Sequence, residues 1–97
     1  MSQVAQTILQ QMGGNMFITM TGARNFLATE NAITMQIAPN AMGVNYVTIT
    51  LNGKDLYDMQ FWRMRSGEKI LHREANDIYF DQLCEIFTTE TGLYTKL

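Results

Sequence analysis

The sequence predicts an α+β fold in which an N-terminal and a C-terminal helix pack on an antiparallel β-sheet of four to five strands. Three observations lead to this prediction. Apolar residues recur at helical spacing near the two ends of the chain, they alternate with polar residues between the ends, and turn residues interrupt this alternation at short intervals. Because no helical segment separates successive strands, the strands are expected to pair antiparallel and to carry the helices on one face.

The first element is expected to be a short amphipathic helix from Ser2 to Met12. Ser2 can cap its start. The Gly13-Gly14 pair can end it, since glycine adopts the left-handed conformation without steric cost. A helix of this length is unstable in isolation, so it must lie on an apolar surface.

The next segments are interpreted as strands. Met16, Ile18 and Met20 alternate with Phe17, Thr19 and Thr21, which predicts a strand over residues 15–21 that Gly22 ends or bends. Residues 23–31 leave two alternatives open, because Phe26 and Leu27 can continue a hairpin arm or pack under a loop, with a turn at residues 29–31.

The clearest alternation lies between residues 33 and 37 and predicts a strand that ends before Pro39, because proline cannot donate to a sheet. A hairpin is then expected over residues 45–65, with Asn52-Gly53 in its turn. A two-residue turn would place Lys54 and Asp58 on the apolar face, so the connection is expected to have an odd number of residues. That register sets Tyr57, Met59 and Phe61 on the same face as Val47, Ile49 and Leu51.

The last elements are expected to be a charged edge strand over residues 68–74 and a helix that Asn76-Asp77 caps and Gly92 ends. Charges on an edge strand discourage unwanted pairing with other chains. The apolar face of the predicted helix comprises Tyr79, Phe80, Leu83, Cys84, Ile86 and Phe87. No internal repeat or linker interrupts the chain, so residues 1–97 are expected to form a single domain.

Composition limits the possible partners. The net charge of −2 gives no general attraction to nucleic acid or to anionic membranes. Only Arg24 and Glu30 are charged before residue 54, which suggests that part of this nearly uncharged half faces another subunit and that the protein is a homodimer.

The eight methionines favour flexible filling of an irregular core, with an adaptable partner surface as the alternative. A single cysteine and the lack of a signal or membrane-spanning segment predict a cytoplasmic protein that does not bind membranes.

No motif indicates catalysis, a cofactor or a metal. His72 is the only histidine and has no second ligand at metal spacing, so a surface strand position is its expected role. Cys84 is expected to be a small core residue, and Asp55 and Asp58 to serve turn geometry. The glycines match no phosphate-binding fingerprint.

One stretch combines aromatic rings with cations. Its candidate binding residues for nucleic acid or another partner are Phe61, Trp62, Arg63, Arg65, Lys69 and Arg73. Such a set can stack bases and neutralise the phosphates of a single strand. The alternative is an ordinary solvated edge, since Glu68 and Glu74 lie among the cations and Trp62 can pack under a helix.

Four stretches, ILQQMGGN, MTGARNF, LNGKDLYD and TGLYTKL, resemble a group of short bacteriophage and mobile-element proteins. The resemblance implies expression in a bacterial cytoplasm beside genes for DNA handling or for evading host defence, and it implies no activity or site. We therefore expect a small non-enzymatic binding protein that contacts another protein, such as a host defence component. The alternatives are single-stranded nucleic-acid binding through residues 61–73 and an enzyme whose site is assembled only on oligomerisation.

Overall fold

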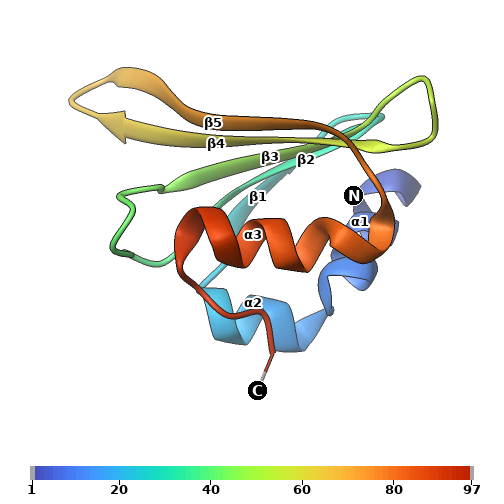
Figure 1. Ribbon diagram of the computed structural model, residues 1–97, viewed down its shortest axis with the longest axis horizontal. Helices are drawn as coiled ribbons and strands as arrows, with labels where there is room; N and C mark the ends of the chain where they lie inside the picture. Colours follow the sequence, from blue (N-terminus) through green and yellow to red (C-terminus); the bar gives the residue numbers. More distant parts are fainter. Residues whose placement is uncertain (1, 97) are drawn as a thin grey trace.

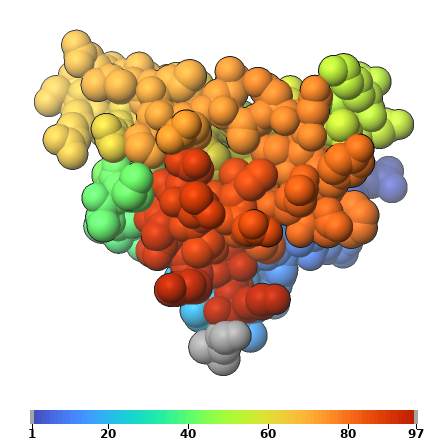
Figure 2. All heavy atoms as spheres, viewed as in Figure 1, coloured from blue at the N-terminus to red at the C-terminus, as the bar shows by residue number. Residues whose placement is uncertain are grey.

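The computed structural model describes residues 2–96 and confirms the α+β fold. Five strands form one antiparallel sheet in the order β1-β2-β3-β4-β5, so each strand lies beside its neighbours in the sequence. The helices lie together below this sheet in a second layer, and no described element lies on its upper face (Figure 1). The tip of the β4–β5 hairpin extends past the rest of the molecule (Figure 2).

Helix α1 (Gln3–Met12) has the predicted limits. The Ser2 hydroxyl accepts a hydrogen bond of 3.1 Å from the backbone amide of Ala5, which satisfies one of the free donors at the helix start. Ala5, Ile8 and Met12 are buried in the core. Gly13 ends the helix with a φ of 124°. The predicted N-terminal cap at Ser2 and the predicted helix end at Gly13 are therefore both confirmed.

The strand predicted over residues 15–21 is wrong, because this segment forms helix α2 (Asn15–Thr21). Phe17 and Thr21, four residues apart, are both buried, whereas a strand would place them on one face together with Thr19. The Thr21 hydroxyl donates to the Phe17 carbonyl at 2.7 Å. Seven residues with apolar side chains at both even and odd positions fit a strand and a buried helix equally well, so packing decides between them.

The strands are β1 (Arg24–Ala28), β2 (Ala32–Gln36), β3 (Tyr46–Leu51), β4 (Tyr57–Arg65) and β5 (Glu68–Ile78). Strand β1 settles the alternative left open for residues 23–31 in favour of a hairpin arm. The two outer strands, β1 and β5, form the edges of the sheet. The predicted edge position of the charged strand is therefore confirmed.

The predicted register of the central hairpin is also confirmed. Leu51 pairs with Tyr57, Ile49 with Met59 and Val47 with Phe61, so the connection over residues 52–56 has an odd length. Asn52 organises this connection, because its side-chain oxygen accepts hydrogen bonds from the backbone amides of Lys54 at 2.8 Å and Leu56 at 3.2 Å.

The predicted helix cap at Asn76-Asp77 is wrong, since both residues belong to β5. The amide of Asp77 donates to the Asp58 carboxylate at 3.0 Å, and Ile78 pairs with Tyr57, so contacts with β4 outweigh the local capping preference. The chain then enters a short 3₁₀ turn, η1 (Phe80–Gln82), and helix α3 (Leu83–Thr91), which Gly92 ends as predicted. Tyr79 and Phe80, placed on the core face by the sequence, are 59% and 61% exposed.

The core lies between the helices and the lower face of the sheet. Its centre is a group of three buried rings, in which Phe87 of α3 lies 5.2 Å from Phe17 of α2 and 6.4 Å from Phe61 of β4, measured between ring centroids. At its margin the Tyr57 hydroxyl donates to the Gln11 side chain at 2.7 Å. Burial raises the pKa of the Tyr57 hydroxyl, and this hydrogen bond partly offsets the rise. No helix in residues 2–96 has the length and apolar character needed to cross a bilayer.

Candidate binding surface on the uncovered sheet face

The upper face of the sheet, here called the uncovered face, carries side chains that alternate with the core residues. Because Ile33, Val47, Ile49, Met59 and Phe61 point into the core, their neighbours along the strands point away from the helices. The residues of the uncovered face include Leu27, Thr34, Gln36, Tyr46, Thr48, Thr50, Gln60, Trp62 and Leu71. Its carboxylates, Asp58 near the start of β4 and Glu74 on the edge strand β5, lie at its margins, so its middle is uncharged.

A row of large side chains crosses this face at one end. Tyr46 on β3 is the cross-strand partner of Trp62 on β4, which in turn pairs with Leu71 on β5. The ammonium group of Lys69 lies 4.0 Å from the centroid of the Trp62 ring, a distance suited to a cation–π contact. Strand pairing thus places two aromatic residues opposite each other on a surface that no helix covers.

Hydrogen bonds between side chains fix the polar part of the uncovered face. Asn25 donates to Gln36, which donates to the Tyr46 hydroxyl. The hydroxyls of Thr34 and Thr48 lie 3.0 Å apart. Because these side chains are already held by one another, a partner that binds here meets a preorganised surface.

The six predicted binding residues do not form one surface. Trp62 and Lys69 lie together on the uncovered face, as described above. Phe61 points the other way and is completely buried in the core, so the expectation that it is available for binding is wrong. A side chain that pairs with Val47 on the apolar face cannot also face solvent.

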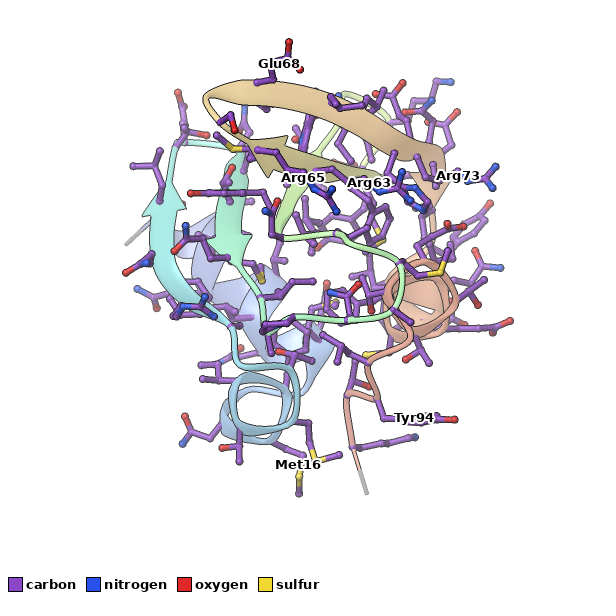
Figure 3. All side chains as sticks on the ribbon, turned by 90° about the vertical axis from the view of Figure 1, so that its left-hand side faces the viewer. Met16, Arg63, Arg65, Glu68, Arg73 and Tyr94 are labelled. Atoms are coloured by element: carbon purple, nitrogen blue, oxygen red, sulfur yellow. The ribbon has the colours of Figure 1, made fainter. Side chains whose placement is uncertain are left out.

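The three predicted arginines lie elsewhere (Figure 3). Arg63 and Arg65 point from β4 toward the loop between β2 and β3, on the helix side of the hairpin. Arg73 lies on β5 near α3, where its Nε is 3.4 Å from the Glu90 carboxylate. Alternation along β4 puts Arg63 and Arg65 on the face opposite to Trp62, and the irregular β4–β5 register between Phe61 and Trp62 shifts the β5 residues, Arg73 among them, relative to β4.

The remaining chemical candidates do not form a reactive group. His72 Nε2 lies 3.7 Å from the Glu90 carboxylate, which is too long for a hydrogen bond, so the contact is an ion pair only when the ring is protonated. The thiol of Cys84 is partly buried beside the Met12 carbonyl, 3.2 Å away. Within residues 2–96, no cluster of three His, Cys, Asp or Glu side chains has a geometry that could hold a metal ion.

Sequence reasoning missed Tyr46, Gln36, Leu27 and Leu71 as surface residues. Leu27, 67% exposed, was missed because the existence of β1 was left open. A signal for the others was present, since the alternation that predicts Val47 and Ile49 in the core also places Tyr46 on the opposite face. Neither predicted helix had a second apolar stripe with which to cover that face.

Comparison of the chain with protein-family models, with curated proteins and with solved structures finds no match.

Proposed function

We propose that this protein is a small non-enzymatic binding protein that acts by contact with another protein through the uncovered face. The observation that carries the proposal is the pair of neighbouring rings, Tyr46 and Trp62, on a sheet face with an uncharged middle. Aromatic residues are enriched, and charges depleted, at the centres of protein interfaces. Exposed Leu27 and Leu71 add apolar contact area on the same face.

The resemblance to bacteriophage and mobile-element proteins supports a bacterial cytoplasmic context for this binding. In that context, a component of a host defence system is the partner class that we propose. A protein of this kind needs no catalytic group, because occupying a partner's surface is sufficient to block it.

Self-association is part of the proposal. The nearly uncharged first half of the chain contributes α1, α2 and the edge strand β1, which carries exposed Leu27. Sedimentation velocity at micromolar concentration is expected to give the mass of a dimer, and Leu27→Glu is expected to shift that mass toward the monomer, since a buried charge at an interface is costly. A monomer mass for the unaltered protein would contradict this part.

Single-stranded nucleic-acid binding is the second candidate function. The specific observation in its favour is Lys69 over the Trp62 ring, beside Tyr46. A base that stacks on Trp62 would displace the Lys69 ammonium from the ring, and the displaced ammonium could then contact a phosphate; each stacked base contributes about 1–3 kcal/mol. Against it stand the acidic net charge and Glu74 at the margin of the same face.

Trp62 provides a test of each candidate, by substitution for the first and by its fluorescence for the second. Trp62→Ala is expected to weaken binding of a partner captured from host cells, and then purified, by at least about tenfold, since truncating a central aromatic residue commonly costs about 2 kcal/mol. The matched control is Tyr79→Ala, because Tyr79 is an exposed ring outside the uncovered face. Equal affinities of the unaltered and Trp62→Ala proteins for that partner would overturn the leading proposal. Quenching of Trp62 fluorescence by an oligonucleotide at low salt, lost as salt rises, would support the second candidate instead.

A further inference from the structure

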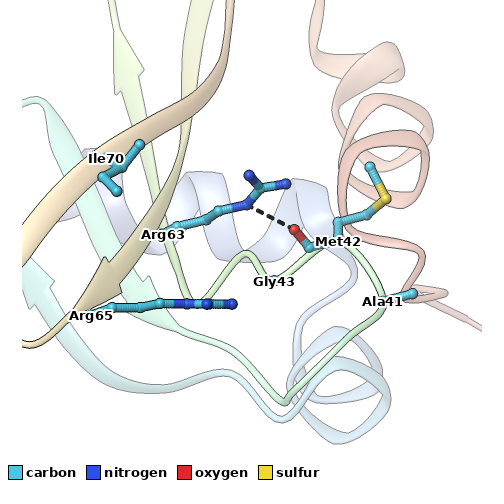
Figure 4. A pocket seen from close by; sticks show the side chains of 6 residues that line it. All are labelled: Ala41, Met42, Gly43, Arg63, Arg65 and Ile70. Atoms are coloured by element: carbon cyan, nitrogen blue, oxygen red, sulfur yellow. Dashed lines mark hydrogen bonds between the residues drawn. The ribbon is translucent and has the colours of Figure 1, made fainter.

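Three arginines line two adjoining hollows beside the loop between β2 and β3, residues 37–45. Arg63 and Arg65 are two positions apart on β4, so their side chains leave the strand on the same side, roughly 7 Å apart. They extend side by side toward the loop (Figure 4). Together with Met42 and Ile70 they line a hollow of about 350 Å³. Arg24, at the start of β1, lines an adjoining hollow of about 330 Å³ that also contains Arg65 and Gly43.

These arginines have no carboxylate partner among the described residues. The ion pairs of residues 2–96 involve Lys54, His72 and Arg73 instead. Glu68 is the cross-strand neighbour of Arg65, but no ion pair joins them and the Glu68 side chain points away from the arginines in Figure 3. Three positive charges that share two hollows without a counter-charge repel one another, and an anion would relieve that repulsion.

Backbone contacts hold two of the guanidinium groups in place. Arg63 Nε donates to the Met42 carbonyl at 2.9 Å, and Arg24 Nη1 donates to the Gly22 carbonyl at 3.0 Å. Each of these groups keeps further N–H donors free for a ligand. The positions of the donors are therefore fixed before any ligand arrives.

Gly43 is the loop residue whose backbone lies beside the arginines. Its φ is 73°, and a Cβ atom there would lie 3.4 Å from Arg63 Nε and 3.6 Å from Arg65 Nη2. These distances are ordinary van der Waals contacts, so the positive φ, rather than a lack of space, is what favours glycine at this position. The backbone of this position, rather than a side chain, therefore forms the floor between the arginines and the loop.

A group of aspartates and the arginine hollows lie at opposite ends of the sheet. Asp55, Asp58 and Asp77 lie at the end that holds the connection between β3 and β4, where Asn52 bonds to Asp58 and Asp77. The arginine hollows lie at the opposite end, at the other termini of the same strands. The aspartates, one of which pairs with Lys54, are therefore remote from the arginines, and Glu68, the acidic residue at the arginine end, forms no ion pair with Arg65.

We infer that the arginine hollows bind a small phosphorylated molecule of nucleotide size. Guanidinium groups bind phosphate oxygens in a bidentate manner, and two of them on one strand can grip one phosphate from both sides. Met42 and Ile70, 36% and 49% exposed, offer apolar contact to the rest of the ligand. The volumes fall in the range of about 300–1,000 Å³ that is usual for small-molecule sites. This site lies on the side of the hairpin opposite to Trp62, so the inference stands or falls independently of the proposed function.

The test uses inorganic phosphate, adenosine 5′-monophosphate and adenosine as probes, with NMR titration and calorimetry on the full chain. Both phosphate-containing probes are expected to shift the amide signals of Met42 and Gly43. Adenosine is expected to bind at least about tenfold more weakly than the monophosphate, because it lacks the charge-assisted hydrogen bonds. Arg63→Gln and Arg65→Gln are each expected to weaken monophosphate binding by at least about tenfold for the same reason.

Arg73→Gln is the matched control, since it removes the same charge from the same sheet at a site already paired with Glu90. It is expected to change the affinity by less than about twofold. Thermal melts establish that each variant is folded. The inference would be overturned if neither phosphate probe bound at about 10 mM, if Arg73→Gln weakened binding as much as Arg65→Gln, or if adenosine bound as tightly as its monophosphate.

Discussion

Phe87→Ala is expected to lower the free energy of unfolding by about 3–5 kcal/mol, the usual cost of truncating a fully buried phenylalanine. Phe87 is completely buried and is the ring that contacts both Phe17 and Phe61. Its loss therefore leaves a cavity bordered by two elements that cannot both move in to fill it. Because small domains are stable by only about 5–15 kcal/mol, much of the stability depends on this side chain.

Phe80→Ala is the matched control. Phe80 precedes the same helix but is exposed, so its truncation is expected to change the free energy of unfolding by no more than about 0.5 kcal/mol. Urea denaturation followed by circular dichroism measures both variants. A loss below about 1 kcal/mol for Phe87→Ala would contradict the ring cluster described for the core.

Gly22→Ala is expected to lower the free energy of unfolding by roughly 3 kcal/mol through two effects. Gly22 ends α2 with a φ of 68°, and alanine pays about 1–2 kcal/mol in this left-handed conformation. The added Cβ would also lie only 2.9 Å from the Cβ of Ala38. Ala38 cannot withdraw freely, because its amide donates to the Thr21 carbonyl at 2.9 Å, and overpacking of this kind costs about 1–3 kcal/mol.

Gly92→Ala separates the two effects. Gly92 ends α3 in the same conformation, with a φ of 77°, but a Cβ there would meet no atom within 4 Å. This variant is expected to lose only the conformational part, about 1–2 kcal/mol. The difference between the two variants in thermal or urea melts measures the clash with Ala38. Equal losses would mean that the chain around Ala38 yields without cost.

The fold was predictable where local pattern and tertiary packing agree. The hairpin of β3 and β4 was placed with its correct register, because only an odd connection keeps Lys54 and Asp58 off the apolar face. Helix α2 was not predictable in the same way, since seven residues with apolar side chains in both phases fit either structure. The start of α3 was misplaced because Asp77 forms hydrogen bonds with β4 and its loop, a tertiary effect that capping preferences do not contain.

The candidate surface was only partly predictable. The sequence brought out Trp62 and Lys69, which do lie together, and the alternation along β4 already separates Phe61, on the apolar face, from Trp62 on the other face. The faces of the β5 residues could not be assigned in the same way, because they depend on the register between β4 and β5, which is irregular between Phe61 and Trp62. Arg24 shares a hollow with Arg65 although they lie on strands that are not neighbours in the sheet, because the loop between β2 and β3 forms part of the same hollow.

The positions of the three core rings along the chain affect how the molecule unfolds. Phe17, Phe61 and Phe87 come from α2, β4 and α3, three segments distant along the chain. Detaching α3 would remove Phe87 from both of the other rings, and detaching α2 or β4 would expose one side of Phe87 to water, so each partial opening is unfavourable. Melting should accordingly follow a single sigmoidal curve by every spectroscopic probe, although every strand pairing in the sheet is local in sequence.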